Sequence, residues 1–317
     1  MNFEKIESAY QLILENTQLI ENDIKTNIYD ALIEQNAFYL GAENAPTKVA
    51  ENNQALKDLQ LSKEEWRRAY QFVFIKASQT EKLQANHQFT PDVIGFLVLY
   101  LLENLTSQEH LDVIEIGSGT GNLAQTLLNN SNRDLDYLGL ELDDLLIDLS
   151  ASIAEVMGAN VSFVQEDAVR PQILKESDVI ISDLPVGYYP NDAIAKRYQV
   201  AATDEHTYAH HLLMEQSLKY LKKDGLAILL APTNLLTSGQ SDLLKKWLAG
   251  YADILAVITL PETLFGNPAK AKSLFLLQKQ DTTKPETFVY HLSDVQNPEI
   301  LQDFMENLKI WKDDNAI

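Results

Sequence analysis

The sequence predicts an α/β fold: a seven-stranded, mostly parallel sheet with helices on both faces, preceded by an all-helical N-terminal region. After Gln79, short runs rich in Val, Ile and Leu alternate with helical stretches, as they do when parallel strands are buried on both faces. Before Gln79, apolar residues recur mostly at spacings of three and four, the period of an amphipathic helix.

The N-terminal region, residues 1–80, is expected to contain helices only. From Phe3 to about Leu40 the apolar positions have the spacing of an amphipathic helical pair. After a polar break, Ser62 and Glu65 form the pattern of a capping box, which predicts a helix from Ser62 to about Ser78. Residues 81–317 form the second predicted domain.

Seven runs in this second domain are predicted to be strands. They read D-V-I-E-I, Y-L-G-L, V-S-F-V-Q, D-V-I-I-S, L-A-I-L-L-A, I-L-A-V-I-T-L and S-L-F-L-L-Q. The last two are separated by P-E-T-L-F-G-N-P-A-K-A-K, which lacks the apolar spacing of a helix. A hairpin-like return is the simpler connection, and it places one antiparallel strand in the sheet.

Composition limits the possible chemistry. The chain has no cysteine, which excludes disulfides, thiolate metal sites and Cys nucleophiles. With 46 acidic and 25 basic residues the net charge is -21, so the molecule as a whole is not expected to attract nucleic acid over a long range. No run approaches the ~20 apolar residues of a membrane span, and the N-terminus does not resemble a signal peptide. We therefore expect a cytoplasmic protein without a membrane partner.

Three successive strands are predicted to end in residues that suit a ligand. The first leads into E-I-G-S-G-T-G-N, residues 115–122, whose glycines permit a tight turn and a close approach to a ligand. The second ends at Glu141, and Asp167 follows the third. Such strand ends share one edge of an open sheet, where ligands bind. Each feature by itself also fits a structural turn or a helix cap.

The fourth strand is followed by S-D-L-P-V-G-Y-Y-P, residues 182–190. An acid, a proline, a glycine and two tyrosines directly after a buried strand are typical of a loop that offers groups to a ligand. A tight turn without a ligand is the alternative.

In the order of these motifs, the sequence resembles class I S-adenosylmethionine-dependent methyltransferases, and in particular the adenine-specific DNA methylases such as the modification subunits of type I restriction systems. Four segments within about residues 85–280 carry the resemblance: H-Q-F-T-P-D-V-I, E-I-G-S-G-T-G-N, S-D-L-P-V-G-Y-Y-P and L-P-E-T-L-F-G-N-P-A-K-A-K-S-L-F-L-L-Q-K. It implies a Rossmann-like methyltransferase sheet and S-adenosylmethionine as the cofactor.

The resemblance also implies which residues bind the cofactor. Thr90 and Pro91 are expected to line its methionine end. Glu141 is expected to hold the ribose, and Asp167 the adenine amino group. The other implied cofactor-binding residues are Glu115, Gly117, Gly119, Gly121, Asn122 and Asp183.

The same resemblance assigns the catalytic loop. Family members carry Asn, Asp or Ser, then Pro-Pro, then an aromatic residue. The polar side chain and a main-chain carbonyl accept hydrogen bonds from the target amine, and the ring stacks on the base. The four positions here are Asp183, Leu184, Pro185 and Val186. Since Val186 has no ring, and stacking on a base is worth ~1–3 kcal/mol, Tyr188 or Tyr189 is expected to replace it.

DNA is the partner that the resemblance implies, with a separate specificity subunit. A weak phosphate-binding rim is expected on loops at the same sheet edge, although solvated surface cations are the alternative. Its residues are Lys196, Arg197, Lys270 and Lys272. No metal site is expected, because the histidines lack a suitable third ligand, and cap or surface positions are predicted for them instead. These are His87, His206, His210 and His211.

Two other readings remain open. The first is a methyltransferase that acts on RNA, protein or a small molecule, which the missing ring at Val186 permits. The second is a non-catalytic, cofactor-binding scaffold descended from a methylase. An NAD-dependent oxidoreductase is less favoured, because the glycines are spaced G-x-G-x-G and not G-x-G-x-x-G.

Overall fold

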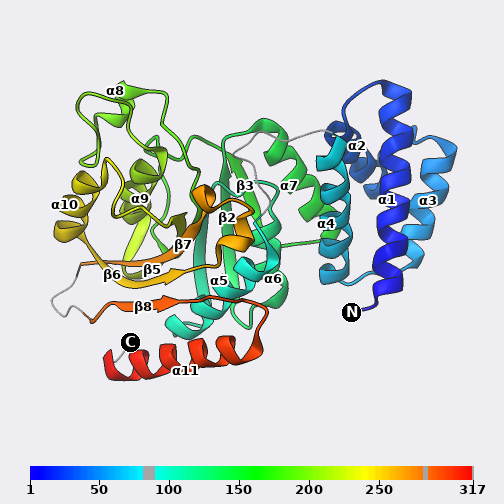
Figure 1. Ribbon diagram of the computed structural model, residues 1–317. Helices are drawn as coiled ribbons and strands as arrows, with labels where there is room; N and C mark the ends of the chain where they lie inside the picture. Colours follow the sequence, from blue (N-terminus) through cyan, green and yellow to red (C-terminus); the bar gives the residue numbers. More distant parts are fainter. Residues whose placement is uncertain (81–89, 281–284, 316–317) are drawn as a thin grey trace.

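The computed structural model describes residues 1–80, 90–280 and 285–315. A helical bundle stands at one end of the molecule and a twisted sheet with its covering helices forms the rest (Figure 1). The first three residues of H-Q-F-T-P-D-V-I, His87 among them, lie outside the described residues.

The sheet has eight strands in the order β3-β2-β1-β4-β5-β7-β6-β8. Only β7 among them runs antiparallel to its neighbours. The strands are β1 (His110–Ile116), β2 (Asp134–Glu141), β3 (Ser162–Gln165), β4 (Ser177–Asp183), β5 (Leu221–Pro232), β6 (Ala252–Thr259), β7 (Lys272–Lys279) and β8 (Phe288–His291). The mostly parallel sheet, its antiparallel strand and all seven predicted strands are thus confirmed. The count of seven omitted β8, which pairs with β6.

The N-terminal bundle consists of α1 (Phe3–Ile24), α2 (Ile28–Leu40), α3 (Thr47–Asp58) and α4 (Lys63–Thr80). The predicted capping box forms: the Glu65 carboxylate accepts from the Ser62 N–H at 3.0 Å, and the Ser62 hydroxyl accepts from the Glu65 N–H at 3.3 Å. The helix α3 lies where a polar break was expected. It buries two asparagines, Asn52 and Asn53, beside Val49 and Leu56. Its inward face is therefore too polar to be recognised from the sequence as the apolar face of a helix.

The bundle packs against the sheet domain through α7 (Asp144–Met157). Leu146, Leu149, Ile153 and Met157 of α7 belong to the same apolar core as the residues of α1, α2 and α4. A division into two domains at residue 80 stays a prediction, because this core crosses the proposed boundary.

Helices cover both faces of the sheet. One face packs on α5 (Asp92–Leu105), α6 (Asn122–Asn130) and α11 (Pro298–Asn315). The other face packs on α9 (Ala209–Tyr220) and α10 (Ser241–Tyr251), with the short α8 (Asp192–Ala195) nearby.

Because β1 to β6 run in the same direction, their carboxyl ends meet at one edge of the sheet, and the antiparallel β7 starts at the same edge. No helix in the described ranges is long and apolar enough to cross a membrane.

Candidate active site

The turn after β1 is built from glycines that adopt left-handed backbone angles. Gly117, Gly119 and Gly121 have φ of 72°, 54° and 76°, which L-residues with a side chain rarely adopt. A Cβ added to Gly117 or Gly119 would meet nothing within 4 Å, whereas one at Gly121 would lie 3.0 Å from Phe163. The first two glycines therefore border open space at the sheet edge, and the third lets α6 start close to β3.

Glu141 lies at the end of β2 beside this glycine turn. Its Oε2 accepts from the Gly119 N–H at 2.8 Å, and its Oε1 accepts from the Leu142 and Asp143 N–H groups at 2.7 Å and 3.0 Å. These bonds fix the carboxylate against the loop. Asp167 lies beyond the end of the next strand, so the three expected cofactor elements share one edge.

Asp167 joins this edge to the loop after β4. Its Oδ2 accepts from the Tyr189 hydroxyl at 2.7 Å, and its Oδ1 from the Val169 N–H at 3.0 Å. Burial, together with the hydrogen bond to Asp167, raises the pKa of Tyr189 to about 12. Tyr189 is 7% exposed, so it holds the loop in place and is not available as the replacement ring.

Thr90 and Pro91 precede α5, and Pro91 is its N-cap residue. The side chain of Asn122, the first residue of α6, donates to the Thr90 carbonyl at 3.2 Å. The Thr90 hydroxyl donates in turn to Asp183 Oδ2 at 3.1 Å. The expected cofactor residues Asn122 and Thr90 are thereby connected to the expected catalytic residue Asp183.

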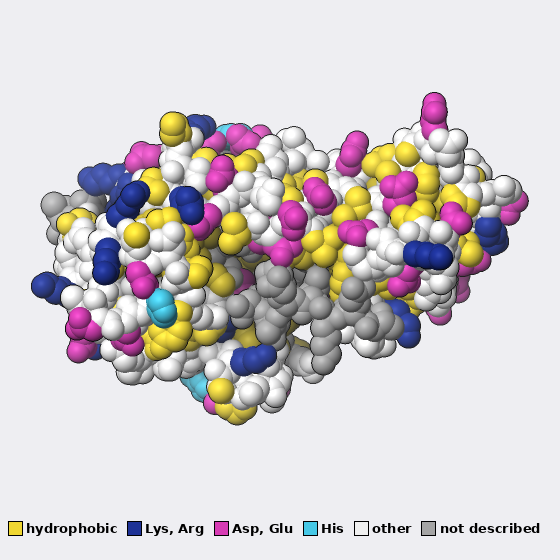
Figure 2. Space-filling model, turned by 90° about the horizontal axis from the view of Figure 1, so that it is seen from above, with side chains coloured by type: hydrophobic (Ala, Val, Ile, Leu, Met, Phe, Trp, Pro, Cys, Tyr) yellow, Lys and Arg dark blue, Asp and Glu magenta, His cyan; other side chains and the backbone are white. Residues whose placement is uncertain are grey.

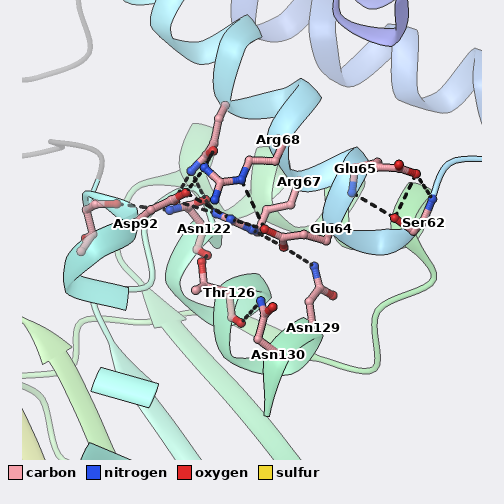
Figure 3. A network of polar contacts seen from close by, with 12 residues as sticks. Ser62, Glu64, Glu65, Arg67, Arg68, Asp92, Asn122, Thr126, Asn129 and Asn130 are labelled. Atoms are coloured by element: carbon pink, nitrogen blue, oxygen red, sulfur yellow. Dashed lines mark hydrogen bonds and ion pairs between the residues drawn. The ribbon is translucent and has the colours of Figure 1, made fainter. Parts of the chain in front are cut away.

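A buried arginine from the N-terminal bundle extends this connection. Arg67 of α4 is 1% exposed and donates to Asp92 at 2.7 Å, to Glu64 at 2.6 Å and to Asn122 at 3.1 Å. Figure 3 shows the side chains of Arg67, Asp92 and Asn122 pointing toward one another from α4, α5 and α6. Burial opposes the ionisation of Asp92, but the hydrogen bond and charge of Arg67 outweigh it and lower its pKa.

Two oxygen atoms at the end of β4 accept hydrogen bonds from the same nitrogen atom. The carboxylate Oδ1 of Asp183 and the carbonyl oxygen of Leu184 both accept from the Nζ of Lys272, the latter at 3.0 Å. Lys272 begins β7 and is paired with Pro232 of β5. These are the two acceptors that the resemblance assigns to a target amine. The prediction that Lys272 belongs to a surface rim is wrong, because its side chain is 16% exposed and bonded inward.

Residues 187–189 are held against the start of α9. Gly187 accepts from the Ala209 N–H at 2.9 Å, and the Tyr189 N–H donates to the Thr207 carbonyl at 2.8 Å. Between these bonds, the Tyr188 ring is 55% exposed and stacks on Tyr208 with centroids 4.9 Å apart. Tyr188 is thus the exposed ring of this loop, whereas Val186, 47% exposed, offers only an aliphatic surface.

Two histidines lie behind this loop, so the prediction of cap or surface positions is wrong for them. His210 and His211 are 4% and 0% exposed, and the His210 ring stacks on Tyr208 with centroids 5.1 Å apart. Burial and the charge of Lys272 lower the pKa of His210 to about 4, and burial lowers that of His211 to about 3. Both rings are therefore neutral at pH 7. His206 is exposed and pairs with Asp192, as a surface residue does.

Glu115 lies beneath the glycine turn and not in the open space above it. It is 2% exposed and accepts from the Tyr137 hydroxyl at 2.9 Å. Burial raises its pKa to about 8; the Tyr137 bond opposes the rise, and the charges of Glu141 and Asp183 add to it. Glu115 therefore holds its proton at pH 7 and is buried in the sheet, where it is bonded to Tyr137.

The remaining rim residues, Lys196, Arg197 and Lys270, are exposed. In Figure 2 many of the Lys and Arg side chains lie toward the end of the molecule that carries α8 and α10, others lie on the N-terminal bundle, and Asp and Glu are spread over the whole face. Within the described ranges, no group of three or more His, Asp or Glu side chains is placed to hold a metal ion.

Sequence reasoning missed three residues of this site: Arg67, Lys272 in its inward position, and Tyr208. Each contacts a residue more than ten positions away in the chain. Local patterns carry no signal for such contacts, although the place of Lys272 at the end of the predicted hairpin return put it at the correct edge of the sheet.

A glycine turn, two strand-end acids and an Asp-Leu-Pro loop on the carboxyl edge of this sheet define a class I S-adenosylmethionine-dependent methyltransferase. Residues 61–312 match the family described as N-6 DNA Methylase. The chain belongs to this family.

The chain is also similar to individual proteins. The chain is 31% identical over 326 residues to the uncharacterized protein YtxK of Bacillus subtilis (strain 168), with 98% of each chain covered. It is 28% identical to a candidate class I S-adenosylmethionine-dependent methyltransferase from Listeria monocytogenes, with a TM-score of 0.90 and coverage of 98% and 99%. A type I restriction-modification methyltransferase subunit from Streptococcus thermophilus shares the fold, with 14% identity, a TM-score of 0.64 and coverage of 95% and 74%.

Proposed function

We propose that this chain transfers a methyl group from S-adenosylmethionine to an exocyclic amino group, with adenine in DNA as the first candidate acceptor. One observation carries the proposal: Asp183 Oδ1 and the Leu184 carbonyl oxygen converge on a single nitrogen atom, the Nζ of Lys272. Two acceptors in this arrangement suit the two N–H groups of a primary amine. Membership of the N-6 DNA Methylase family supports adenine as the acceptor.

The residues at the sheet edge fit the cofactor. The open space beside Gly117 and Gly119 admits a ligand next to the backbone, and Glu141 and Asp167 offer carboxylate oxygens for its ribose and adenine groups. When bound, S-adenosylmethionine supplies a methyl group on a positively charged sulfur. Carboxylates along this edge also suit a cation.

The proposed work of the protein groups is orientation. Asp183 Oδ1 and the Leu184 carbonyl oxygen accept hydrogen bonds from the two N–H groups of the amine, so that its lone pair is held in one direction. Thr90 donates to the other carboxylate oxygen of Asp183 at 3.1 Å and fixes the plane of the carboxylate. Such positioning lowers the entropic part of the barrier without a strong base. Tyr188 is the proposed ring against which the acceptor stacks.

A side-chain amide or amine of a protein is the second candidate acceptor. It is favoured by the exposed Val186 where an aromatic residue is expected. A net charge of -21 suits a basic polypeptide better than a phosphate backbone.

The experiment that tests the proposal supplies the purified protein with tritiated S-adenosylmethionine and the DNA, RNA and protein fractions of a cell that lacks the gene. Label in the DNA, recovered as N6-methyladenine, supports the first candidate, and label in one protein band supports the second. No transfer to any fraction by a protein that binds the cofactor contradicts the proposed activity.

A further inference from the structure

Lys272 stands where the proposed function needs an acceptor nitrogen. Its ammonium group bonds to both Asp183 Oδ1 and the Leu184 carbonyl oxygen. The side chains of Lys272 and Asp183 are 16% and 21% exposed, so the pair is largely enclosed. An acceptor amine and the Lys272 ammonium cannot occupy this position together. The acceptor subsite is therefore closed in this structure by a residue of the chain itself.

The backbone of Lys272 is fixed, whereas its side chain can leave. Lys272 pairs with Pro232 in the sheet, and the preceding Ala271 carbonyl accepts from the Thr233 N–H at 3.0 Å. The lysine side chain beyond Cα is a flexible four-carbon stem with a compact charge at its end. Rotation of this stem would move the ammonium group away from both oxygens while the backbone pairing of Lys272 stays in place.

The charge of the cofactor supplies a reason for the side chain to leave. In a reactive arrangement the amine nitrogen and the methyl carbon are ~3–3.5 Å apart, so an ammonium in the place of the amine would lie close to the sulfonium of a bound cofactor as well. Two positive charges at such a distance in a partly buried site repel strongly. Glu141 is bonded to backbone N–H groups and Asp167 to Tyr189 and Val169, so Asp183 is the carboxylate that Lys272 and the sulfonium would share, and one negative charge compensates only one of them.

We propose that Lys272 closes the acceptor subsite while no sulfonium is bound and withdraws when S-adenosylmethionine binds. The inference rests on the proposed roles of Asp183 and Leu184. It makes the acceptor bind after the cofactor. It also makes the subsite close again over the product S-adenosylhomocysteine, which lacks the positive charge. By linkage, removing the lysine charge must strengthen S-adenosylmethionine binding more than S-adenosylhomocysteine binding.

The first measurement is calorimetric titration of both ligands into the wild type and three variants. Lys272→Met removes the charge. Lys272→Gln also removes it but keeps N–H groups for both oxygens, which protects the fold. Lys279→Met is the matched control, because Lys279 lies on the same strand and pairs with Glu176 at 3.3 Å. Both Lys272 variants are expected to gain about tenfold in affinity for S-adenosylmethionine relative to S-adenosylhomocysteine, and Lys279→Met is expected to keep the wild-type ratio.

The second measurement follows the side chain itself. The wild-type protein is treated with an amine-acetylating reagent, and the acetylation rates of Lys272 and Lys279 are read by peptide mass spectrometry. Lys272 is expected to react several-fold faster with saturating S-adenosylmethionine than with saturating S-adenosylhomocysteine, while Lys279 reacts equally in both.

The outcomes separate the inference from the proposed function. An unchanged affinity ratio in both Lys272 variants, or Lys272 acetylation that is no faster with S-adenosylmethionine, overturns the proposed withdrawal of Lys272 and leaves the proposed activity standing. A wild-type protein that binds neither ligand overturns the proposed function and the proposed role of Lys272 together.

Discussion

Glu115 lies in the interior of the sheet, protonated at neutral pH, with its pKa raised from 4.5 to about 8, chiefly by burial. The unfolded chain releases this proton near pH 4.5, whereas the folded chain keeps it up to about pH 8. Between these values the unfolded state binds fewer protons, so this group lowers the stability of the protein as the pH rises.

Glu115→Gln is therefore expected to stabilise the protein at pH 8 by about 2 kcal/mol or more, and to have little effect at pH 4, where both states are protonated. Urea denaturation at a series of pH values measures this, with the exposed Glu109→Gln as the control. A stability difference that does not change with pH would mean that Glu115 is ionised in the folded protein.

Asp167 has two roles that a single substitution tests together. It accepts from Tyr189 at 2.7 Å and is the proposed partner of the cofactor adenine. Asp167→Ala is expected to weaken S-adenosylmethionine binding by ~1–3 kcal/mol, the effect of losing a buried hydrogen bond. Tyr189→Phe separates the roles, because it removes the loop contact and keeps the carboxylate. Calorimetry that finds the same affinity for Asp167→Ala and wild type would rule out the adenine contact.

At the scale of elements, α4 reaches the cofactor turn through Arg67, which contacts Asp92 of α5 and Asn122 of α6. Breaking a buried ion pair by removing one partner costs about 3–5 kcal/mol. Arg67→Met is expected to destabilise the protein by this order, and to weaken cofactor binding several-fold because Asn122 holds the Thr90 carbonyl at 3.2 Å.

Arg68→Met is the matched control for this prediction. Arg68 also pairs with Glu64 and Asp92, but its side chain is 29% exposed, so its loss is expected to cost less than about 1 kcal/mol. Denaturation and calorimetry on both variants measure the two effects. Equal losses in stability and affinity for the two arginines would show that the contact with Asn122 has no particular role.

Some helices and strands were easier to predict from the local sequence than others. The seven strands and the antiparallel return were predicted, because apolar β-branched runs and turn residues are local signals. The helix α3 was not, since it buries Asn52 and Asn53 within a network in which Asn16 donates to Gln35 at 2.9 Å. Strand β8 is four residues long and has alternating burial, which is too short a pattern to stand out from a loop.

At the scale of the whole molecule, charge limits how the chain can hold DNA. The net charge is -21. Because Lys272 is bonded inward, the proposed rim keeps three cations, Lys196, Arg197 and Lys270. Binding to duplex DNA is therefore expected to be weak, with a slope of log K against log salt of about -3. Titration of a labelled duplex at several salt concentrations measures the slope.

The double variant Lys196→Ala, Arg197→Ala is expected to reduce this slope in magnitude by about 2. Lys245→Ala and Lys246→Ala on α10 serve together as the charge-matched control. If the control variant changes the slope and the rim variant does not, the DNA contact lies on α10 and not on the proposed rim.

The order of motifs along the whole chain predicted which edge of the sheet carries the site. It did not predict that Lys272 occupies the acceptor subsite. Glycines and acids at strand ends indicate the ligand edge, since parallel strands bring their carboxyl ends together. The pairing of Lys272 with Asp183 joins residues 89 positions apart, and the burial of His210 depends on the loop that covers it. Such long-range contacts arise only once the sheet and its loops have assembled.

The most direct test compares Asp183→Ala with Asp178→Ala in methyl transfer and in cofactor binding. Asp178 is a fair control, because it lies on the same strand and pairs with a lysine, Lys222, at 2.9 Å. We expect Asp183→Ala to abolish transfer to the acceptor fraction that the wild type labels while its S-adenosylmethionine affinity stays within a few-fold of wild type. Asp178→Ala should retain transfer. Undiminished transfer by a folded Asp183→Ala protein would contradict the assignment of Asp183 and Leu184 as the acceptor site.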